Sequence, residues 1–200
     1  GRLGDIEGAV GIRSGGKAAV GGVRLLHCKA AAEIIYCAGG ECVVDCLRGG
    51  IMRIAIVRNG KELAERAFVE IMKVLAEKPD AVIGFATGAT PVPLYEKMAD
   101  DHKKNGTSYK RVRAFNLDEY VGVDKNDKAS FARFMRDNLF SKIDIDPANT
   151  DIPNGMAEAL SAEWARYSAK GKAIPADIQI LGIGENGLIA FNEPYTRREE

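Results

Sequence analysis

The sequence lacks any apolar run that approaches the length of about 18 residues needed to cross a membrane. Its amino-terminal segment also lacks the charged stretch, apolar core and small-residue cleavage site of a signal peptide. An excess of one charge is missing too, because 28 Lys and Arg residues balance 28 Asp and Glu residues. A surface that binds nucleic acid is therefore not expected. These absences predict a cytoplasmic protein with neither a membrane nor nucleic acid as its partner.

The four cysteines lack the spacing of a typical zinc site. They stand at Cys28, Cys37, Cys42 and Cys46, and no two of them form the pattern Cys-x2-Cys. His27 directly precedes Cys28, so a zinc site stays an alternative. A disulfide framework lacks the secretory context that usually accompanies it. We expect reduced thiols and no metal.

Residues 1–51 lack a sustained helix or strand period. They hold twelve of the 22 glycines and all four cysteines, and glycine pairs interrupt the segment throughout. From Met52 the pattern changes to Met-Arg-Ile-Ala-Ile-Val, which is typical of a buried strand. We interpret residues 1–51 as a poorly ordered Gly/Cys-rich extension outside the fold, and 52–200 as the functional domain. A small Cys-rich accessory segment is the alternative.

After Met52, apolar strand patterns alternate with helical ones. The expected strands are 53–57, 81–86, 112–116 and 177–183, and the expected helices are 62–77, 91–98, 130–140 and 156–170. This alternation predicts an α/β fold, with a mostly parallel sheet that has helices on both faces. The length of 200 residues is enough for one domain with a substantial core.

A strand, a small-residue turn and a helix start follow one another in 85–91, Phe-Ala-Thr-Gly-Ala-Thr-Pro. Backbone N–H groups and two hydroxyls gather there, and the helix dipole adds partial positive charge. A phosphate-like anion is the ligand that such a turn favours, and an ordinary turn capped by Thr90 is the alternative. The segment is not a Walker loop, because no Gly-Lys-Ser/Thr is present.

Two adjacent carboxylates, Asp118 and Glu119, follow the strand that ends at Asn116. One of them, partly desolvated at the strand end, would be suited to act as a general base on a carbon-bound proton. A solvated surface turn is the alternative.

The segment 181–194 leads from an apolar strand into a glycine-rich turn with the polar residues Asn186 and Glu193. Ligands bind at such strand ends in open α/β sheets, although a tight glycine loop without a ligand is the alternative. Leu188 places a hydrocarbon side chain in the middle of the polar cluster. The three turns all follow strands, so we expect them on one edge of the sheet.

Four longer motifs run through residues 52–194. They are 84–95 (Gly-Phe-Ala-Thr-Gly-Ala-Thr-Pro-Val-Pro-Leu-Tyr), 115–122 (Phe-Asn-Leu-Asp-Glu-Tyr-Val-Gly), 134–140 (Phe-Met-Arg-Asp-Asn-Leu-Phe) and 181–194 (Leu-Gly-Ile-Gly-Glu-Asn-Gly through Phe-Asn-Glu-Pro). Together they resemble the amino-terminal part of the glucosamine-6-phosphate deaminase (glucosamine-6-phosphate isomerase) family. The resemblance implies a Rossmann-like fold and a cytoplasmic enzyme of amino-sugar catabolism. That enzyme converts glucosamine 6-phosphate and water to fructose 6-phosphate and ammonia, without an organic cofactor or metal.

The resemblance also implies roles for individual residues. The turn that would bind the substrate phosphate consists of Thr87, Gly88, Ala89 and Thr90. Asp118 would move a proton between C1 and C2 of the opened sugar. Asn186 and Glu193 would orient a histidine that helps to open the pyranose ring.

Two departures from the family pattern bear on activity. Leu188 occupies the position of the ring-opening histidine, and a leucine side chain can neither carry a proton nor form a hydrogen bond. Loss of such a group typically lowers the rate by roughly 10²–10⁴-fold. The family also continues beyond Pro194 through elements that complete the phosphate site with an arginine and a lysine. We therefore expect a domain truncated at its carboxyl end, with an exposed sheet edge and little or no activity.

Three alternatives are weighed against a deaminase. A 6-phosphogluconolactonase-like hydrolase is the nearest enzyme, but the Asn-Leu-Asp-Glu-Tyr and Phe-Asn-Glu-Pro motifs argue against it. A non-catalytic phosphosugar-sensing domain would suit a site without its histidine, although residues 1–51 show no helix-turn-helix. An inactive fragment is the third. The expected partner is a small-molecule phosphosugar, and the resemblance leaves a homo-oligomer open.

Overall fold

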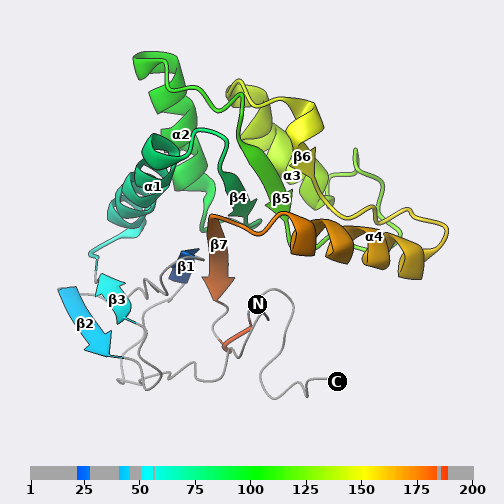
Figure 1. Ribbon diagram of the computed structural model, residues 1–200, viewed down its shortest axis with the longest axis horizontal. Helices are drawn as coiled ribbons and strands as arrows, with labels where there is room; N and C mark the ends of the chain where they lie inside the picture. Colours follow the sequence, from blue (N-terminus) through cyan, green and yellow to red (C-terminus); the bar gives the residue numbers. More distant parts are fainter. Residues whose placement is uncertain (1–21, 28–40, 46–50, 56, 184–185, 189–200) are drawn as a thin grey trace.

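A computed structural model of the chain describes residues 22–27, 41–45, 51–55, 57–183 and 186–188. The centre of the fold is a parallel sheet (Figure 1). Its four strands, in spatial order, are β7 (Ile178–Ile183), β4 (Val82–Phe85), β5 (Arg113–Asn116) and β6 (Thr150–Asp151). Strand β1 (Gly22–His27) pairs antiparallel with the outer side of β7. Strands β2 (Glu41–Asp45) and β3 (Ile51–Ala55) form a separate antiparallel pair.

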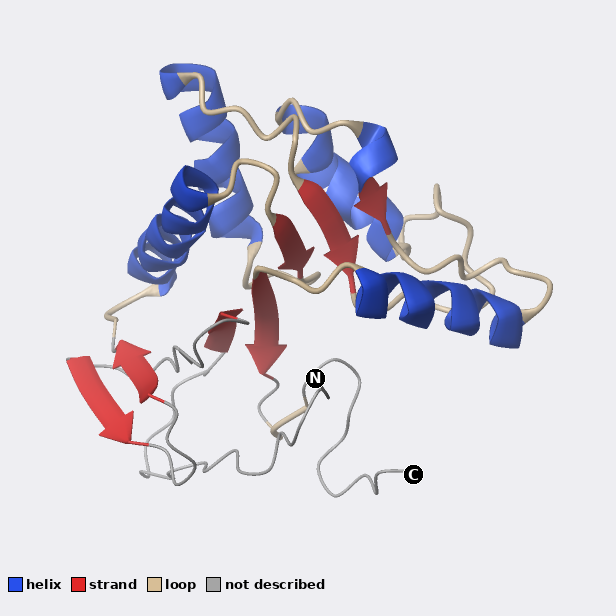
Figure 2. Cartoon of the chain, in the orientation of Figure 1, coloured by secondary structure: helices blue, strands red, loops and turns tan. Residues whose placement is uncertain are grey.

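The helices of the described residues lie between these strands in sequence (Figure 2). They are α1 (Gly60–Glu77), α2 (Val92–Asn105), α3 (Phe131–Asn138) and α4 (Leu160–Ala173), with short 3-10 turns at Phe140–Lys142 and Pro147–Asn149. Helix α2 connects β4 to its neighbour β5, and α3 connects β5 to its neighbour β6. Helix α4 runs in the opposite direction across the sheet and connects β6 to β7. Right-handed crossovers therefore place α4 on the face opposite α2 and α3. The predicted α/β fold with a mostly parallel sheet is confirmed.

Helix α1 begins at a reciprocal cap. The Asn59 side chain accepts a hydrogen bond from the backbone N–H of Glu62 at 3.0 Å, and the Glu62 carboxylate accepts one from the N–H of Arg58 at 3.0 Å. One face of the helix is apolar and packs against the rest of the core. Its buried side chains are Leu63, Ala64, Ala67, Ile71, Val74 and Leu75. Since each large one contributes roughly 1.5–3 kcal/mol on full burial, this face anchors the helix.

The hydrophobic core continues between α2, α3 and the sheet. Phe85 at the end of β4 makes edge-to-face contacts with Tyr95 and Phe140, with ring centroids 5.7 and 6.1 Å apart. All four residues of β4 are buried, as are the first four of β7. Strands covered on both faces are expected to be apolar without alternation, which is why the sequence pattern identified them.

The boundaries of two helices differ from the prediction by more than two residues. Helix α2 was expected to end at Met98 but continues to Asn105, where Gly106 has φ 73° and forms a left-handed cap. Its last turns are polar, so they carry no apolar period. The helix predicted from Met156 begins at Leu160 instead.

Asn154 explains the late start of α4. Its side chain accepts a hydrogen bond from the N–H of Met156 at 3.0 Å, and its own N–H donates to Glu163 at 2.8 Å. These bonds hold the residues before Leu160 in a turn. Strand β6 was missed because two residues contain no readable period.

The first strands differ from what the sequence pattern predicted. The strand predicted at 53–57 is observed at Ile51–Ala55 and pairs with β2 outside the main sheet. Residues 1–51 were placed outside the fold, yet Gly22–His27 within them forms β1. The edge of β7, expected to be exposed, is covered by β1, because an unpaired row of backbone N–H and C=O groups readily takes up another strand. A division into 1–51 and 52–200 stays a proposal.

Helix α4 differs from the others in having no buried residue. Trp164, the only tryptophan of the chain, is 74% exposed there. Polar contacts hold the helix instead: Arg166 makes two hydrogen bonds to the Asp151 carboxylate at 3.1 and 3.2 Å, and Lys170 lies 2.7 Å from it. No helix in the described part of the chain is long and apolar enough to cross a membrane.

Candidate functional site

The turn after β4 leaves several polar groups open. Within the described part of the chain, the backbone N–H groups of residues 87–90 donate to no other atom, and these residues are exposed or half-exposed. Gly88 has φ 103°, which favours glycine. Helix α2 follows at once, with Pro91 at its N-cap and no side-chain cap, so Thr90 does not cap it. Open amides beside an uncapped helix start favour an anion.

Tyr95, in the first turn of α2, holds the start of this turn. Its hydroxyl accepts a hydrogen bond from the N–H of Ala86 at 3.1 Å and donates one to the C=O of the same residue. Burial raises the pKa of the Tyr95 phenol, so the donor is retained at any physiological pH. The residue before the open amides is therefore held at both of its backbone groups.

Asn116 links the ends of β4 and β5. Its side-chain N–H donates to the C=O of Phe85 at 3.0 Å, and only 1% of the residue is exposed. Its Oδ1 is buried and has no hydrogen-bond partner in the described part of the chain. An unpaired buried oxygen costs about 1–3 kcal/mol. Asn116 thus sets the spacing of two strand ends at some expense in stability.

Glu119 closes the amino end of α3. Its carboxylate accepts hydrogen bonds from the N–H groups of Phe131 and Ala132, both at 3.0 Å, and from the hydroxyl of Ser130 at 2.8 Å. The N–H of Tyr120 adds a fourth at 2.9 Å. Burial raises the pKa of Glu119, but these hydrogen bonds outweigh it and hold the pKa below its ordinary value. Glu119 is therefore a structural anion.

Asp118, one residue earlier, has the opposite environment. Among the described residues its carboxylate has no hydrogen bond or ion pair. Burial, and then the charge of Glu119, raise the pKa of Asp118. A raised pKa makes a carboxylate a stronger proton acceptor, which is what a general base requires. The strand-end pattern alone left open which of the two carboxylates is the base, and the family resemblance implied Asp118. This contrast also favours Asp118.

Tyr167 connects helix α4 to the end of β5, close to Asp118. Its hydroxyl donates to the C=O of Asn116 and lies 3.3 Å from the C=O of Asp151. Burial, the charge of Asp151 and, more weakly, the charge of Asp118 raise the pKa of Tyr167. The phenol therefore stays neutral and lies close enough to Asp118 to interact with its charge.

The third turn, after β7, is described in part. The side chain of Asn186 accepts a hydrogen bond from the N–H of Leu188 at 3.1 Å, and Leu188 is half-buried. Glu193 lies outside the described residues, so its predicted place in the cluster is not located. The apolar side chain at position 188 offers no proton-transfer group beside Asn186.

The arrangement of the strands brings the three turns together. Because β7, β4 and β5 are parallel neighbours, their carboxyl ends lie on one edge (Figure 1), and the turn of 87–90 lies in the middle. Tyr95, Asn116 and Tyr167 had no predicted role, since no local pattern indicates contacts between distant segments. Among the described residues, no three His, Cys, Asp or Glu side chains are grouped to hold a metal ion. The edge combines open backbone amides, which favour an anion, with an unpaired carboxylate.

Comparison with known proteins gives a matching family. Residues 58–190 match the model of glucosamine-6-phosphate isomerases/6-phosphogluconolactonase. A glucosamine-6-phosphate deaminase of Geobacillus sp. (strain WCH70) is 42% identical over 146 residues, which are 72% of this chain and 58% of the relative. Glucosamine-6-phosphate deaminase 1 of Giardia intestinalis is 45% identical over 130 residues, 64% of this chain and 49% of the relative. The chain thus spans about half to three-fifths of these relatives.

Solved structures show the same likeness. A monomeric glucosamine-6-phosphate deaminase superimposes with a TM-score of 0.66 at 37% identity, over 70% of this chain and 59% of that one. The 6-phosphogluconolactonase of Thermotoga maritima superimposes with a TM-score of 0.50 at 24% identity, over 57% and 50% of the two chains. The second likeness shows a shared fold alone.

Proposed function

The chain belongs to the glucosamine-6-phosphate isomerase/6-phosphogluconolactonase family, and from this premise we propose that its carboxyl edge is the phosphosugar site of a glucosamine-6-phosphate deaminase. The reaction is the isomerisation and hydrolytic deamination of glucosamine 6-phosphate to fructose 6-phosphate and ammonia. The relatives with higher identity are named deaminases, and the 6-phosphogluconolactonase shares only the fold. The proposed setting is amino-sugar catabolism in the cytoplasm.

The difference between Asp118 and Glu119 carries this proposal. Four hydrogen bonds commit Glu119 to the start of α3, whereas Asp118 is unpaired within the described residues and has a raised pKa. The neighbouring strand ends in the open amides of 87–90. A base beside an anion site suits a substrate with an acidic C–H at one end and a phosphate at the other.

The proposed chemistry uses these groups in sequence. The amides and hydroxyls of Thr87–Thr90 bind the phosphate, which places the opened sugar over the strand ends. Asp118 accepts the proton from C2 and returns it to C1, while O1 takes up a proton and the nitrogen loses one, so that the C1 aldehyde becomes an alcohol and the C2 amine becomes an imine. Water adds to that imine, the C2–N bond breaks, and the products are the C2 ketone and ammonia. Tyr167 and Asn116 hold the strand end that carries the base.

Leu188 favours a second candidate, a domain that binds a phosphosugar without turning it over. Ring opening requires a proton to be delivered to and removed from sugar oxygens, and leucine does neither. Asn186, proposed to orient the ring-opening group, instead holds the backbone N–H of Leu188. Both candidates share the phosphate turn, so binding and turnover need separate experiments.

Binding is tested by titrating the full chain with glucosamine 6-phosphate and with inorganic phosphate. We expect Thr87→Ala/Thr90→Ala to weaken both ligands by about tenfold, because two hydroxyl donors are lost. The control Ser161→Ala removes an exposed hydroxyl from α4, away from the turn, and should change nothing. Equal affinity of the double variant and the parent chain would contradict the phosphate site.

Turnover is tested by ammonia release from glucosamine 6-phosphate. We expect little or no release by the chain as it stands, and an increase on Leu188→His that is abolished again by adding Asp118→Asn. Binding without release in either form supports the sensing candidate. Robust release by the unmodified chain would show that the histidine position is dispensable.

A further inference from the structure

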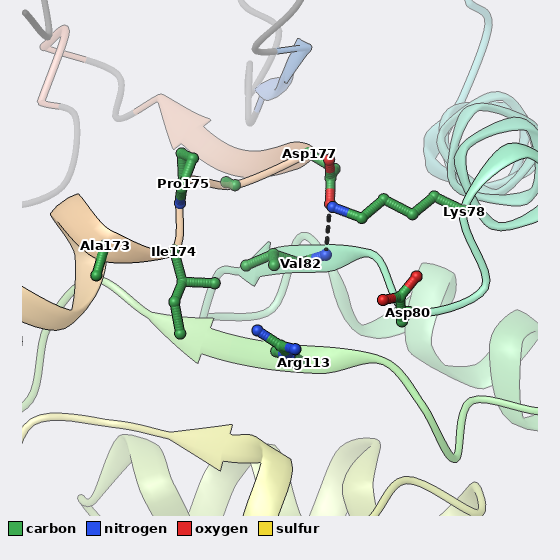
Figure 3. A pocket seen from close by; sticks show the side chains of 9 residues that line it. Lys78, Asp80, Val82, Arg113, Ala173, Ile174, Pro175 and Asp177 are labelled. Carbon is green, nitrogen blue, oxygen red and sulfur yellow. Dashed lines mark hydrogen bonds and ion pairs between the residues drawn. The ribbon is translucent and has the colours of Figure 1, made fainter. Parts of the chain in front are cut away.

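A cavity of about 450 Å³ lies at the amino edge of the sheet, opposite the candidate site. It is formed where the α4–β7 connection, Ile174–Ala176, passes the first residues of β4 and β5 (Figure 3). A cavity of this size is within the range of roughly 300–1,000 Å³ that small-molecule sites occupy. No part of the proposed deaminase site contributes to it.

The walls of this cavity are held by specific hydrogen bonds. The Asp177 carboxylate accepts one from Lys78 Nζ at 2.7 Å and one from the backbone N–H of Val82 at 2.8 Å. The N–H of Asp177 donates in return to the C=O of Val82 at 2.8 Å. These bonds join the α1–β4 connection, strand β4 and the start of β7. The cavity is therefore a built feature of the edge.

Its charged groups divide into a closed pair and two open groups. Lys78 and Asp177 neutralise each other. Arg113, which the strand register places opposite Val82, and Asp80 also line the cavity (Figure 3). Neither the Arg113 guanidinium nor the Asp80 carboxylate has a hydrogen bond or ion pair with any described residue, and the two are not paired with each other. One open cation and one open anion thus face the same space.

We propose that this cavity binds a small zwitterion, an α-amino acid with an apolar side chain. Its carboxylate pairs with Arg113, whose planar guanidinium suits a carboxylate, and its ammonium group pairs with Asp80. A simple anion would leave Asp80 as a repelling neighbour, and a simple cation would meet Arg113 in the same way. Only a ligand with both charges satisfies both groups.

The apolar part of the lining selects the side chain. Ile174, Pro175 and Ala173 line the cavity beside the charged groups, and Figure 3 draws Arg113 between Ile174 and Asp80. With its carboxylate on Arg113 and its ammonium group toward Asp80, the amino acid directs its side chain toward Ile174. A branched aliphatic side chain buries apolar area there, whereas a charged one would be desolvated without a partner.

The test uses L-leucine and two analogues that each lack one charge. In ¹⁵N-labelled full chain, we expect L-leucine to shift the amide signals of residues 80, 113, 174, 176 and 177 saturably, with a dissociation constant on the order of 1 mM. Deaminated leucine (4-methylpentanoate) and decarboxylated leucine (3-methylbutylamine) should each bind roughly three- to tenfold more weakly. Equal binding of 4-methylpentanoate and leucine, or no saturable leucine shift, would overturn the proposal.

Charge-neutralising variants assign the two contacts. Arg113→Gln should weaken leucine and strengthen 3-methylbutylamine, because the repelling cation is removed. Asp80→Asn should weaken leucine and strengthen 4-methylpentanoate, because the repelling anion is removed. Arg111→Gln and Glu77→Gln are matched controls, because both residues are exposed and lie outside the cavity lining. An equal loss of leucine binding in a control would show a diffuse charge effect and would refute the site. All of these outcomes are independent of sugar-phosphate binding at the other edge.

Discussion

The two edges of the central sheet use polar side chains in different ways. At the amino edge, the Asp177 carboxylate accepts hydrogen bonds from Lys78 and from the backbone N–H of Val82, and so joins neighbouring segments. At the carboxyl edge, residues that hold the backbone alternate with groups left open: Glu119 is saturated, whereas Asp118 beside it is unpaired within the described residues. At the carboxyl edge, the residues that hold the backbone and those left open to a ligand are therefore different, although they are neighbours in the chain.

Replacing Glu119 with alanine should have the largest effect on stability. The N–H groups of Phe131 and Ala132 and the Ser130 hydroxyl lose a charged acceptor, so we expect the free energy of unfolding to fall by about 3 kcal/mol. Urea unfolding followed by circular dichroism measures it. Glu119→Gln, which keeps one acceptor oxygen, should lose about half as much.

The same variant predicts a pH dependence. Because the folded-state pKa of Glu119 is lowered, its stabilising contribution is present above the ordinary carboxyl pKa and is lost as the pH falls through the folded-state pKa. The difference in unfolding free energy between the parent chain and Glu119→Ala should therefore shrink in acid. A difference that is constant down to strong acid would contradict the role of the charge.

Replacing Asp177 with alanine should weaken the amino edge less, by about 2 kcal/mol. One partly buried backbone N–H loses its acceptor and a half-exposed lysine loses its partner. Asp177→Asn keeps an acceptor for Val82 and should cost less than about 1 kcal/mol. If Asp177→Ala lowers the free energy of unfolding more than Glu119→Ala does in the same urea experiment, the contacts at the amino edge contribute more to stability than those at the carboxyl edge.

Replacing Gly88 with alanine should cost about 1–2 kcal/mol, because an L residue is strained at φ 103° even though the space beside Gly88 is open. Gly60→Ala is a matched control. A Cβ there also meets nothing within 4 Å, but φ is not positive, so alanine should be neutral or slightly stabilising. The anion-site proposal adds that Gly88→Ala also lowers phosphate affinity. Unchanged affinity would separate the turn from phosphate binding.

Replacing Asp118 with asparagine should have the smallest effect and the opposite sign, a gain of less than about 1 kcal/mol at neutral pH. Since the folded-state pKa of Asp118 is raised, the parent chain loses stability as the pH rises through that pKa. Asparagine has no such loss, so the gain should vanish in acid. A destabilised variant at neutral pH would mean that Asp118 belongs to the framework.

The parts of the fold predictable from sequence are those whose pattern is local. The apolar residues of β4 and β7, and the Asn59 cap with its apolar stripe on α1, each lie within one short segment. Helix α4 began late because Glu163 binds the N–H of Asn154, a contact that no apolar period reveals. Strand β1 went unrecognised because its pairing with β7 joins segments more than 150 residues apart.

The candidate site divides in the same way. Strand ends followed by Thr87–Thr90, Asp118 and Asn186 were predictable, because parallel strands bring their carboxyl ends together. The residues that hold these ends were not. Tyr167 and Asn116 are 51 positions apart in the sequence, and neither residue type predicts that the two form a hydrogen bond. The family resemblance pointed to Asp118, but the physical reason that Glu119 is occupied elsewhere required knowing where α3 begins.

The exposed indole on α4 has a practical consequence for spectroscopy. Trp164 is the chain's sole tryptophan and is 74% exposed in the folded state, so its fluorescence already has the red-shifted emission of an indole in water. Unfolding changes that environment little, and a tryptophan fluorescence melt would understate the transition. The buried phenols of Tyr95 and Tyr109 are the chromophores that move from core to solvent. Tyrosine absorbance would therefore follow unfolding of the core, which Trp164 fluorescence would hardly register.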